Sequence, residues 1–361
     1  MSVGERTARS AAALTRAVAG DRPVWPALGA SGLVAALYES GGRVDPERLG
    51  RLLAAVDTVH PIGVTLGVCV QVAAALPLLR STLPDHPLTA EATAGRAVLA
   101  LAATDSGRGS RLSSLATGYR IDGDRLTLTG SKRWITNART ADAFLVLARH
   151  EEGPHFTNFS FVLVPAGAPG VTVTPTRTGL FGGAELGDVT FSDVQLPATA
   201  VIGGRGRGMA LFARHIGTER LAGGLWAVAL CRRVLVDTVE RLRRPDDGGT
   251  CLWQDPGVRR QVAACLARVH ELRAVCVTAG PWVVERHDPA AAARVKIATA
   301  DTVDRVLGEC ARLHGAAGFV DGGIQRLRTE AAVFGIGGGV GEVALELVAD
   351  RVDDLLHGLA W

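Results

Sequence analysis

The chain has 361 residues, of which 47% are hydrophobic and 21% are charged, and its formal net charge is +3. This composition is that of a folded protein with a large core, and the length suits two or three domains. Because no run of Lys and Arg is interleaved with aromatic residues, we expect no nucleic-acid partner. Lys132 and Lys296 are the only lysines among many arginines, which we attribute to genome composition rather than to function.

The predicted elements change character twice along the chain. Residues 1–100 are rich in Ala and Leu and predict helices, one of which has Asp45 as its N-cap and Pro46 at its first position. Residues 101–204 switch to short alternating strands, with a hairpin about Asp122-Gly123. Residues 205–361 return to long helices with apolar stripes. We therefore predict an α+β fold with an N-terminal helical domain (1–100), a middle barrel or sandwich (101–204) and a C-terminal helical bundle (205–361).

Cysteine usage and apolar segments predict where the protein resides. The six cysteines form no Cys-x-x-Cys pair and mostly lie among apolar residues, which favours buried thiols in a reducing cytoplasm. The N-terminal stretch lacks the apolar core of a signal peptide. Residues 61–79 are uncharged, but Pro77 and several polar residues favour a helix buried in protein, so we expect no membrane association. The scattered histidines show no metal-ligand spacing, so we predict no metal site.

The segment "GSKRWITNARTAD", residues 130–142, carries the most chemical information. Its Trp134 and Thr136 allow two interpretations that the segment alone does not separate. The indole packs against the side of the sheet, or it stacks on a flat ligand while the Thr136 hydroxyl meets the ligand's edge.

Together with "ATDSGRGS" upstream, this segment resembles the middle domain of the acyl-CoA dehydrogenase family. That family carries Thr-Glu-Pro-x-x-Gly-Ser-Asp and then Lys-x-Trp-Ile-Thr-Asn, and the second motif is complete in this sequence. The first motif is matched in part, by Thr104, Gly107, Gly109 and Ser110. The similarity continues from about residue 33 to about residue 352, and it implies a helical domain, a β-barrel and a C-terminal four-helix bundle.

The resemblance also implies a bound FAD and the residues that hold it. Trp134 would stack on the isoalloxazine ring and Thr136 would hydrogen-bond its N5 atom. Thr104 would hold the pyrimidine edge, and Ser110 would lie at the ribityl-phosphate end. A stacked ring and a donor at N5 are what a flavin that receives hydride requires.

The glycine-rich stretch "FGIGGGVGE", residues 334–342, does not have the spacing of a dinucleotide-binding loop and follows a predicted helix instead of a strand. A turn between helices that needs positive φ is the simpler interpretation. By the resemblance, Gly338 stands where the family usually carries its catalytic Glu. The backbone N–H of Gly338 would still bind the thioester carbonyl.

Some family members hold the base elsewhere, as the Glu of a Glu-Arg pair that is Glu219-Arg220 in this sequence. Glu219 is therefore the candidate base, although a Glu at this point also serves as a purely structural helix residue. Trp226 follows on the same predicted helix, where it either shapes the acyl pocket or packs between helices.

Two further positions bear on FAD held by a neighbouring subunit. The family's Arg-x-x-Phe-Gly, which grips the diphosphate, is replaced by "RRPDDGG", and Arg244 is the nearest substitute. The turn at Gly315 matches the family's neighbour-facing turn. We therefore expect a homodimer or homotetramer, with acyl-CoA or acyl-carrier protein as partner and an unidentified electron acceptor.

The expected function is FAD-dependent dehydrogenation of an acyl thioester. Two alternatives stay open at this point: a flavin-dependent oxidase or monooxygenase on the same fold, and an acyl-thioester-binding homologue without redox activity.

Overall fold

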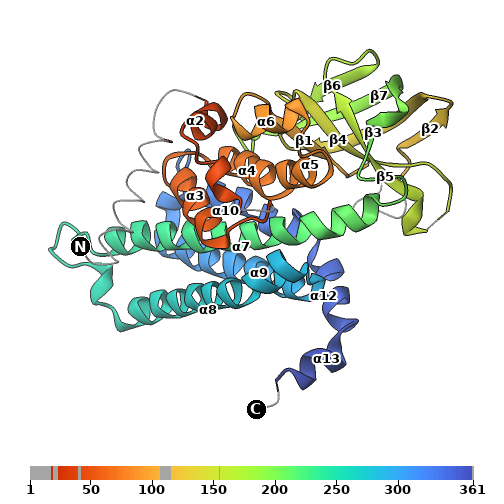
Figure 1. The fold of residues 1–361 in the computed structure, drawn as a ribbon. Helices are drawn as coiled ribbons and strands as arrows, with labels where there is room; N and C mark the ends of the chain where they lie inside the picture. The colour runs from red at the N-terminus through yellow and green to blue at the C-terminus, as the bar shows by residue number, and fades with distance from the viewer. Residues whose placement is uncertain (1–17, 19–22, 40–41, 106–114, 154, 360–361) are drawn as a thin grey trace. The chain divides into compact units, whose positions relative to one another are not determined.

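The computed structural model describes residue 18 and residues 23–39, 42–105, 115–153 and 155–359. Contacts divide the chain into two compact units, Met1–Glu219 and Arg220–Trp361, and the boundary falls inside one long helix, α7 (Gly208–Leu242). Helices combined with a single large sheet confirm the predicted α+β class (Figure 1). The finer division at residues 100/101 and 204/205 stays a prediction.

The first unit opens with short helices: α2 (Val24–Ala30), η1 (Ala35–Leu37), α3 (Pro46–Val59), α4 (Ile62–Val70), η2 (Gln71–Ala75), α5 (Leu76–Thr82) and α6 (Pro87–Thr93). The start of α3 follows the predicted pattern. The Asp45 side chain accepts hydrogen bonds from Glu47 N–H and Arg48 N–H, and Pro46 occupies the first turn, where its missing N–H costs nothing.

The apolar run over α4, η2 and α5 is a core helix, as predicted. Residues Ile62–Thr82 are long and apolar enough to cross a membrane, yet 89% of the most apolar window is buried inside the protein. Pro77 cannot donate a backbone hydrogen bond, and η2 just before it is a single π-helical turn, the usual local adjustment in an interrupted helix. Ile324–Ala349 passes the same test with 17% buried, but it is broken into shorter helices.

The rest of the first unit is mostly one sheet of eight strands: β1 (Leu99–Ala102), β2 (Gly118–Asp122), β3 (Arg125–Ile135), β4 (Ala143–Arg149), β5 (Phe159–Pro165), β6 (Val171–Pro175), β7 (Gly187–Pro197) and β8 (Val201–Ile202). Their order is β6-β7-β3-β2-β4-β5-β8, with β1 parallel to β4. Pairing among the described residues does not join β6 to β8, so closure into a barrel stays a prediction.

The sheet carries a well-packed apolar core. The predicted hairpin is present between β2 and β3, where Asp122 pairs with Arg125 and Gly123 takes φ +59° in the two-residue turn. The core gathers side chains that alternate along the strands, including Leu126, Leu128, Phe144, Val162 and Phe191. Burial follows the predicted period of two along β3 and β7, whereas β4 and β5 are buried on both faces and so differ from the predicted alternation.

The second unit is helical. Besides the C-terminal part of α7 it contains η6 (Leu252–Gln254), α8 (Pro256–Arg286), α9 (Pro289–His314), η7 (Gly315–Phe319), α10 (Ile324–Ala331), α11 (Val333–Ile336), α12 (Gly341–Ala349) and α13 (Val352–His357). Gly224 lets α7 approach its neighbours, because an added Cβ would lie 2.7 Å from both Cys276 Sγ on α8 and Val295 Cγ1 on α9.

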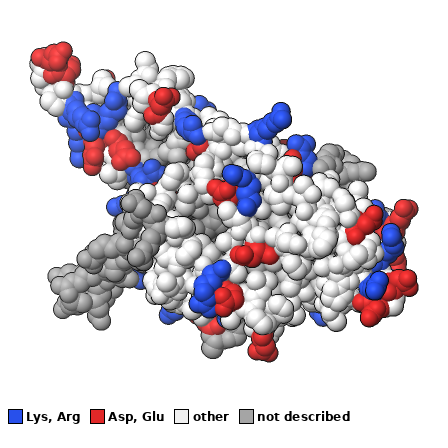
Figure 2. All heavy atoms as spheres, turned by 90° about the horizontal axis from the view of Figure 1, so that it is seen from above, with Lys and Arg blue, Asp and Glu red and all other residues white. Residues whose placement is uncertain are grey.

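On the face shown in Figure 2, acidic and basic side chains of the described residues are interspersed among uncharged ones.

Candidate active site

The predicted flavin platform, Trp134, lies in a strained bulge near the end of β3. Its φ is +58°, and the register between β3 and β7 shifts between Lys132 and Ile135. Asp188 on β7 holds this bulge, because one carboxylate oxygen accepts Trp134 N–H at 3.0 Å and the other accepts Arg133 Nε–H at 3.0 Å. Trp134 is nevertheless 51% exposed. A positive φ in a bulky residue together with an exposed ring is unusual and favours a ligand-facing role.

The electrostatics of Asp188 agree with this holding role. Partial burial acts to raise the pKa of Asp188, but hydrogen bonds from Trp134 N–H and the Arg133 side chain outweigh it and hold the pKa below its ordinary value. The carboxylate is therefore charged at neutral pH and remains an acceptor for the Trp134 backbone. Sequence analysis did not identify Asp188, which lies 54 residues further along the chain.

Thr136 and Thr104 are brought to the same part of the sheet as Trp134. Thr104 C=O accepts Arg133 N–H at 3.0 Å, so the segment after β1 runs beside the end of β3. Both threonines are half-buried, and within the described part of the chain neither hydroxyl takes part in a hydrogen bond. An exposed indole beside two uncommitted hydroxyls fits a flat heteroaromatic ligand with polar edges. Ser110, also predicted here, lies outside the described residues.

A buried ion pair joins Asp105 to Lys132 on the strand that carries Trp134. Lys132 Nζ lies 2.5 Å from Asp105 Oδ1 and also donates to Ala103 O and Leu147 O. Burial lowers the pKa of Lys132 to about 8, while Asp105 acts in the opposite direction, so the ammonium is charged at pH 7. Asp105 Oδ2 also accepts the N–H groups of Ala116 and Thr117. One carboxylate thus joins the main chain at Ala116 and Thr117 to Lys132 on the strand that carries Trp134.

Glu219, the candidate base, is half-buried on α7 within the first unit. Burial raises the pKa of the Cys69 thiol on α4, and the negative charge of Glu219 raises it further. Glu219 therefore lies close enough to α4 for its charge to act on Cys69. The next residue, Arg220, is rotated by about 100° around the helix and belongs to a different set of contacts.

The glycine-rich stretch is a turn between α11 and α12, in agreement with the simpler interpretation from the sequence. Gly338 and Gly339 have φ values of +73° and +93°, which side chains disfavour. Arg220 Nε donates to Gly338 O at 2.9 Å, and Lys296 Nζ donates to Phe334 O and Gly337 O, both at 2.5 Å. Within the described residues, the N–H groups of Gly338 and Gly339 donate no hydrogen bond.

Both lysines of the chain are thus buried, with 0% exposure for Lys132 and 4% for Lys296. Each binds main-chain carbonyl oxygens beside a predicted site segment. Composition alone suggested no function for them. The rarity of lysine in an arginine-rich chain could have indicated that these two positions are special. A compact ammonium fits narrow sites that a planar guanidinium does not.

Trp226 packs between helices. It is 1% exposed, and its ring centroid lies 4.6 Å from that of Phe334 on α11.

Arg244 is exposed just after α7, where its N–H bonds to Arg241 O. Nearby, Asp246 Oδ1 is committed to the N–H groups of Gly248 and Thr250. Gly315 has φ +57° at the end of α9. A cofactor role for Arg244 and Gly315 stays a prediction.

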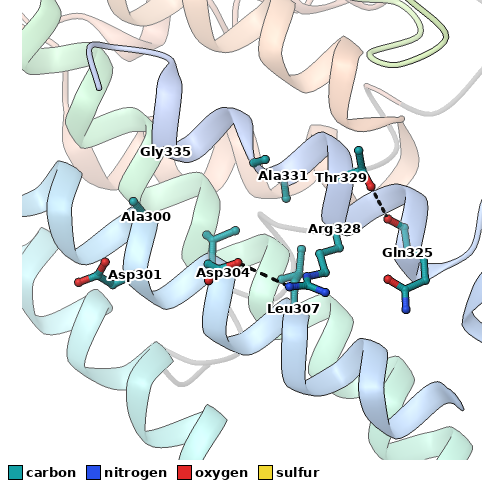
Figure 3. Close-up of a pocket in the computed structure, with 11 residues that line it drawn as sticks. Ala300, Asp301, Asp304, Leu307, Gln325, Arg328, Thr329, Ala331 and Gly335 are labelled. Carbon is teal, nitrogen blue, oxygen red and sulfur yellow. Dashed lines mark hydrogen bonds and ion pairs between the residues drawn. The ribbon is translucent and has the colours of Figure 1, made fainter. Parts of the chain in front are cut away.

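A separate hollow of about 530 Å³ lies in the second unit (Figure 3). Its lining comes from α9, α10 and α11, and Arg328 reaches Asp304 across it at 3.9 Å. It contains none of the predicted site residues, and we assign it no function.

Comparison with known proteins agrees with this arrangement. Residues 100–194 match the family model "Acyl-CoA dehydrogenase, middle domain", and residues 206–352 match "Acyl-CoA dehydrogenase, C-terminal domain". The chain is 28% identical over 329 residues to the acyl-(acyl-carrier-protein) dehydrogenase MbtN of Mycobacterium bovis, covering 89% of this chain and 84% of that protein.

Solved structures share the fold. Butyryl-CoA dehydrogenase from Megasphaera elsdenii superposes with a TM-score of 0.85 at 20% identity, covering 92% of this chain and 90% of that one. The FAD complex of PigA superposes with a TM-score of 0.83 at 21% identity, covering 91% and 89%.

Proposed function

Because the chain belongs to the acyl-CoA dehydrogenase family, we propose that it is a flavoenzyme that oxidises an acyl thioester to its α,β-unsaturated form with FAD. The observation that carries this proposal is the Trp134 bulge. Half-exposed Trp134 is held at positive φ by Asp188, beside Thr104 and Thr136, whose hydroxyls form no hydrogen bond within the described residues. A stacked flavin would account for the exposed ring at this bulge.

The chain's own residues fit FAD at this point. Trp134 would support the ring, and Thr136 and Thr104 would donate to its polar edges. Bound FAD would supply the two-electron acceptor that takes hydride from the β-carbon. PigA, a neighbour in fold, is described as an FAD complex, which supports the same cofactor here.

Glu219 is the group we propose to remove the α-proton. Gly338 leaves no carboxylate at the position predicted for the usual base, and Glu219 is a half-buried carboxylate on α7 whose charge helps to raise the pKa of the buried Cys69 thiol. General-base help is worth roughly 10²–10⁴-fold for such a proton transfer. The Gly338 N–H, which has no acceptor among the described residues, would hydrogen-bond the thioester carbonyl and stabilise the charge that develops there.

The substrate is proposed as a thioester of CoA or of acyl-carrier protein. MbtN, which aligns with most of this chain, is by name an acyl-carrier-protein dehydrogenase. We also propose a cytoplasmic homodimer or homotetramer. Exposed apolar side chains on the C-terminal helices, such as Ile336, Leu345 and Leu356, support a second copy as the partner. A monomer in sedimentation at micromolar concentration would contradict it.

The first test of the proposed function is whether the purified protein has the yellow colour of bound flavin. We expect the purified protein to be yellow and to release FAD on denaturation. A set of acyl-CoA and acyl-pantetheine thioesters is then mixed anaerobically with the wild type, and flavin bleaching is followed. Glu219→Gln should slow bleaching by orders of magnitude with FAD still bound, because it keeps the shape but not the base. The matched control is Glu240→Gln, an exposed position on the same helix.

A second candidate function is flavin-dependent oxidation or oxygenation with O₂. The glycine at position 338 favours it, because such chemistry does not need the usual base. Its signature is a Glu219→Gln variant that reacts as fast as the wild type. A protein that never binds FAD, even in excess, would instead point to a thioester-binding homologue without redox activity.

A further inference from the structure

Two buried cations bind the main chain of the glycine turn. Lys296 on α9 is 4% exposed, and Arg220 on α7 is 7% exposed. Lys296 Nζ donates to Phe334 O and Gly337 O, and Arg220 Nε donates to Gly338 O. Three carbonyl oxygens within five residues are therefore bound by two positive charges. Charge-assisted hydrogen bonds of this kind are about twice as strong as neutral ones.

The planarity of the peptide bond converts these contacts into control over N–H groups. In a trans peptide, the C=O of one residue and the N–H of the next lie in one plane and point in opposite directions. By binding Gly337 O, Lys296 fixes the direction of Gly338 N–H. By binding Gly338 O, Arg220 fixes the direction of Gly339 N–H. Neither of these two N–H groups donates a hydrogen bond within the described part of the chain.

The turn needs such support because its own residues supply little. Gly337, Gly338 and Gly339 have no side chains to pack, and glycine loses more conformational freedom on ordering than any other residue. Arg220 also fills the space beside the turn, since a Cβ added at Gly338 would meet its Cγ at 3.5 Å and one at Gly339 would meet its Nη2 at 3.1 Å.

We propose that Lys296 is a positioning residue that aims the Gly338 N–H at the thioester carbonyl, and that Arg220 does the same for the following peptide. This inference rests on the proposed function. A cation on the carbonyl side of a peptide also polarises the group and strengthens its N–H as a donor. The contacts of Lys296 and Arg220 thus order a turn that has no side chains of its own to pack. They hold the Gly338 N–H in place as a donor for the negative charge that develops on the thioester carbonyl oxygen.

The choice of lysine follows from the geometry. One ammonium carries three donors around a single atom and reaches Phe334 O and Gly337 O together. These carbonyls belong to the last turn of α11 and to the residue after it, so Lys296 also closes the C-terminal end of that helix.

The first arm of the test needs no substrate. Lys296→Met keeps the chain length but removes both hydrogen bonds, and Arg328→Met removes a partly exposed cation on α10 as the matched control. Amide hydrogen exchange is measured on peptides covering residues 333–341, with peptides of α8 as internal reference. We expect faster exchange in 333–341 only for Lys296→Met. Unchanged exchange in that peptide overturns the inference whatever the protein's activity.

The second arm tests the catalytic consequence. With a thioester that bleaches the wild-type flavin, Lys296→Met should lower the maximal reduction rate by roughly 10- to 100-fold, by comparison with loss of an oxyanion donor. KM should change little, and reduction by dithionite should be unaffected, because it does not use the carbonyl donor. Lys296→Arg keeps the positive charge but not the compact ammonium, so it should recover only part of the rate.

The possible failures are distinguishable. If exchange rises but the thioester reduces the variant at the wild-type rate, Lys296 is structural only and the inference is wrong, while the proposed function stands. If no thioester reduces the wild-type flavin, the proposed function fails together with this catalytic role. In that case the exchange result still decides whether Lys296 orders the turn.

Discussion

Asn137 Nδ2 donates to Gly67 O at 3.0 Å, which joins the turn after β3 to helix α4. The approach is close enough that a Cβ added at Gly67 would lie 2.7 Å from Asn137 Oδ1. Asn137 has φ +65°, and its N–H bonds to Ala184 O. The position of Thr136 and Trp134 therefore depends on a helix that lies 70 residues earlier in the sequence.

Gly67→Ala should disturb the predicted flavin platform. The added methyl displaces the Asn137 carboxamide, and losing a buried hydrogen bond costs about 1–3 kcal/mol, more than the helix propensity gained from alanine. We expect lower stability in urea unfolding and weaker FAD binding in titrations of the apoprotein. Gly308→Ala on α9 is the control, because its methyl would meet Arg328 only at ordinary contact distance. Wild-type behaviour of Gly67→Ala would show that this contact does not position the platform.

Trp134→Ala should weaken FAD binding by roughly 5- to 100-fold, since stacking of an aromatic side chain on a flat base is worth about 1–3 kcal/mol. Trp134→Phe should keep most of the affinity. The measurement is the change in flavin fluorescence on titration, with Trp282→Ala, an exposed tryptophan on α8, as the control. Equal affinity of Trp134→Ala and wild type would mean that the indole has another role.

The buried pair of Lys132 and Asp105 predicts a pH dependence of stability. Burial lowers the pKa of Lys132 from 10.5 to about 8. Between those pH values the unfolded chain binds more protons than the folded one, so the contribution of this group to stability rises with pH. The reference is the neutral pair Lys132→Met with Asp105→Asn. Relative to it, we expect the wild type to gain on the order of 1–3 kcal/mol between pH 8 and pH 10.5 in urea unfolding. A difference that stays constant or falls would show that Lys132 keeps its proton.

The cysteines should react unequally. Five are buried and Cys251 is half-buried. Burial raises the pKa of Cys276 to about 12 and that of Cys310 to about 11, and the thiolate is the reactive form. At pH 8 a disulfide reagent should therefore label Cys251 first and the others only on unfolding. Cys251→Ser should abolish the fast phase, and several fast thiols in the native protein would contradict the buried placement.

Moving the carboxylate tests the base assignment. In Glu219→Gly with Gly338→Glu, the new Cβ has room, since it would meet Arg220 Cγ at 3.5 Å. The positive φ at residue 338 costs about 1–2 kcal/mol for a side chain, and loose positioning lowers the rate. We expect flavin reduction slower than in the wild type but faster than in Glu219→Gly with Gly338→Gln. Equal rates in the two double variants would show that a carboxylate at position 338 does not serve as the base.

The sequence by itself was enough for the local features. Asp45 and Pro46 start a helix, the Asp-Gly hairpin joins two strands, and alternation marks the core face, because each depends on neighbours a few residues away. Motif resemblance extended this to the family, and the glycine run was correctly interpreted as a turn with positive φ. The sequence also showed that a glycine, Gly338, stands where the family resemblance predicts the catalytic carboxylate.

Only the tertiary structure decided what holds the site. Asp188 supports Trp134, Gly67 meets Asn137, and Arg220 binds Gly338 across 118 residues of chain. A charged or amide side chain can satisfy its hydrogen bonds in many ways, so its partner depends on which distant main-chain groups the fold brings near. For the same reason the two lysines were uninformative as composition, and their role emerged only when both were found buried against carbonyl oxygens.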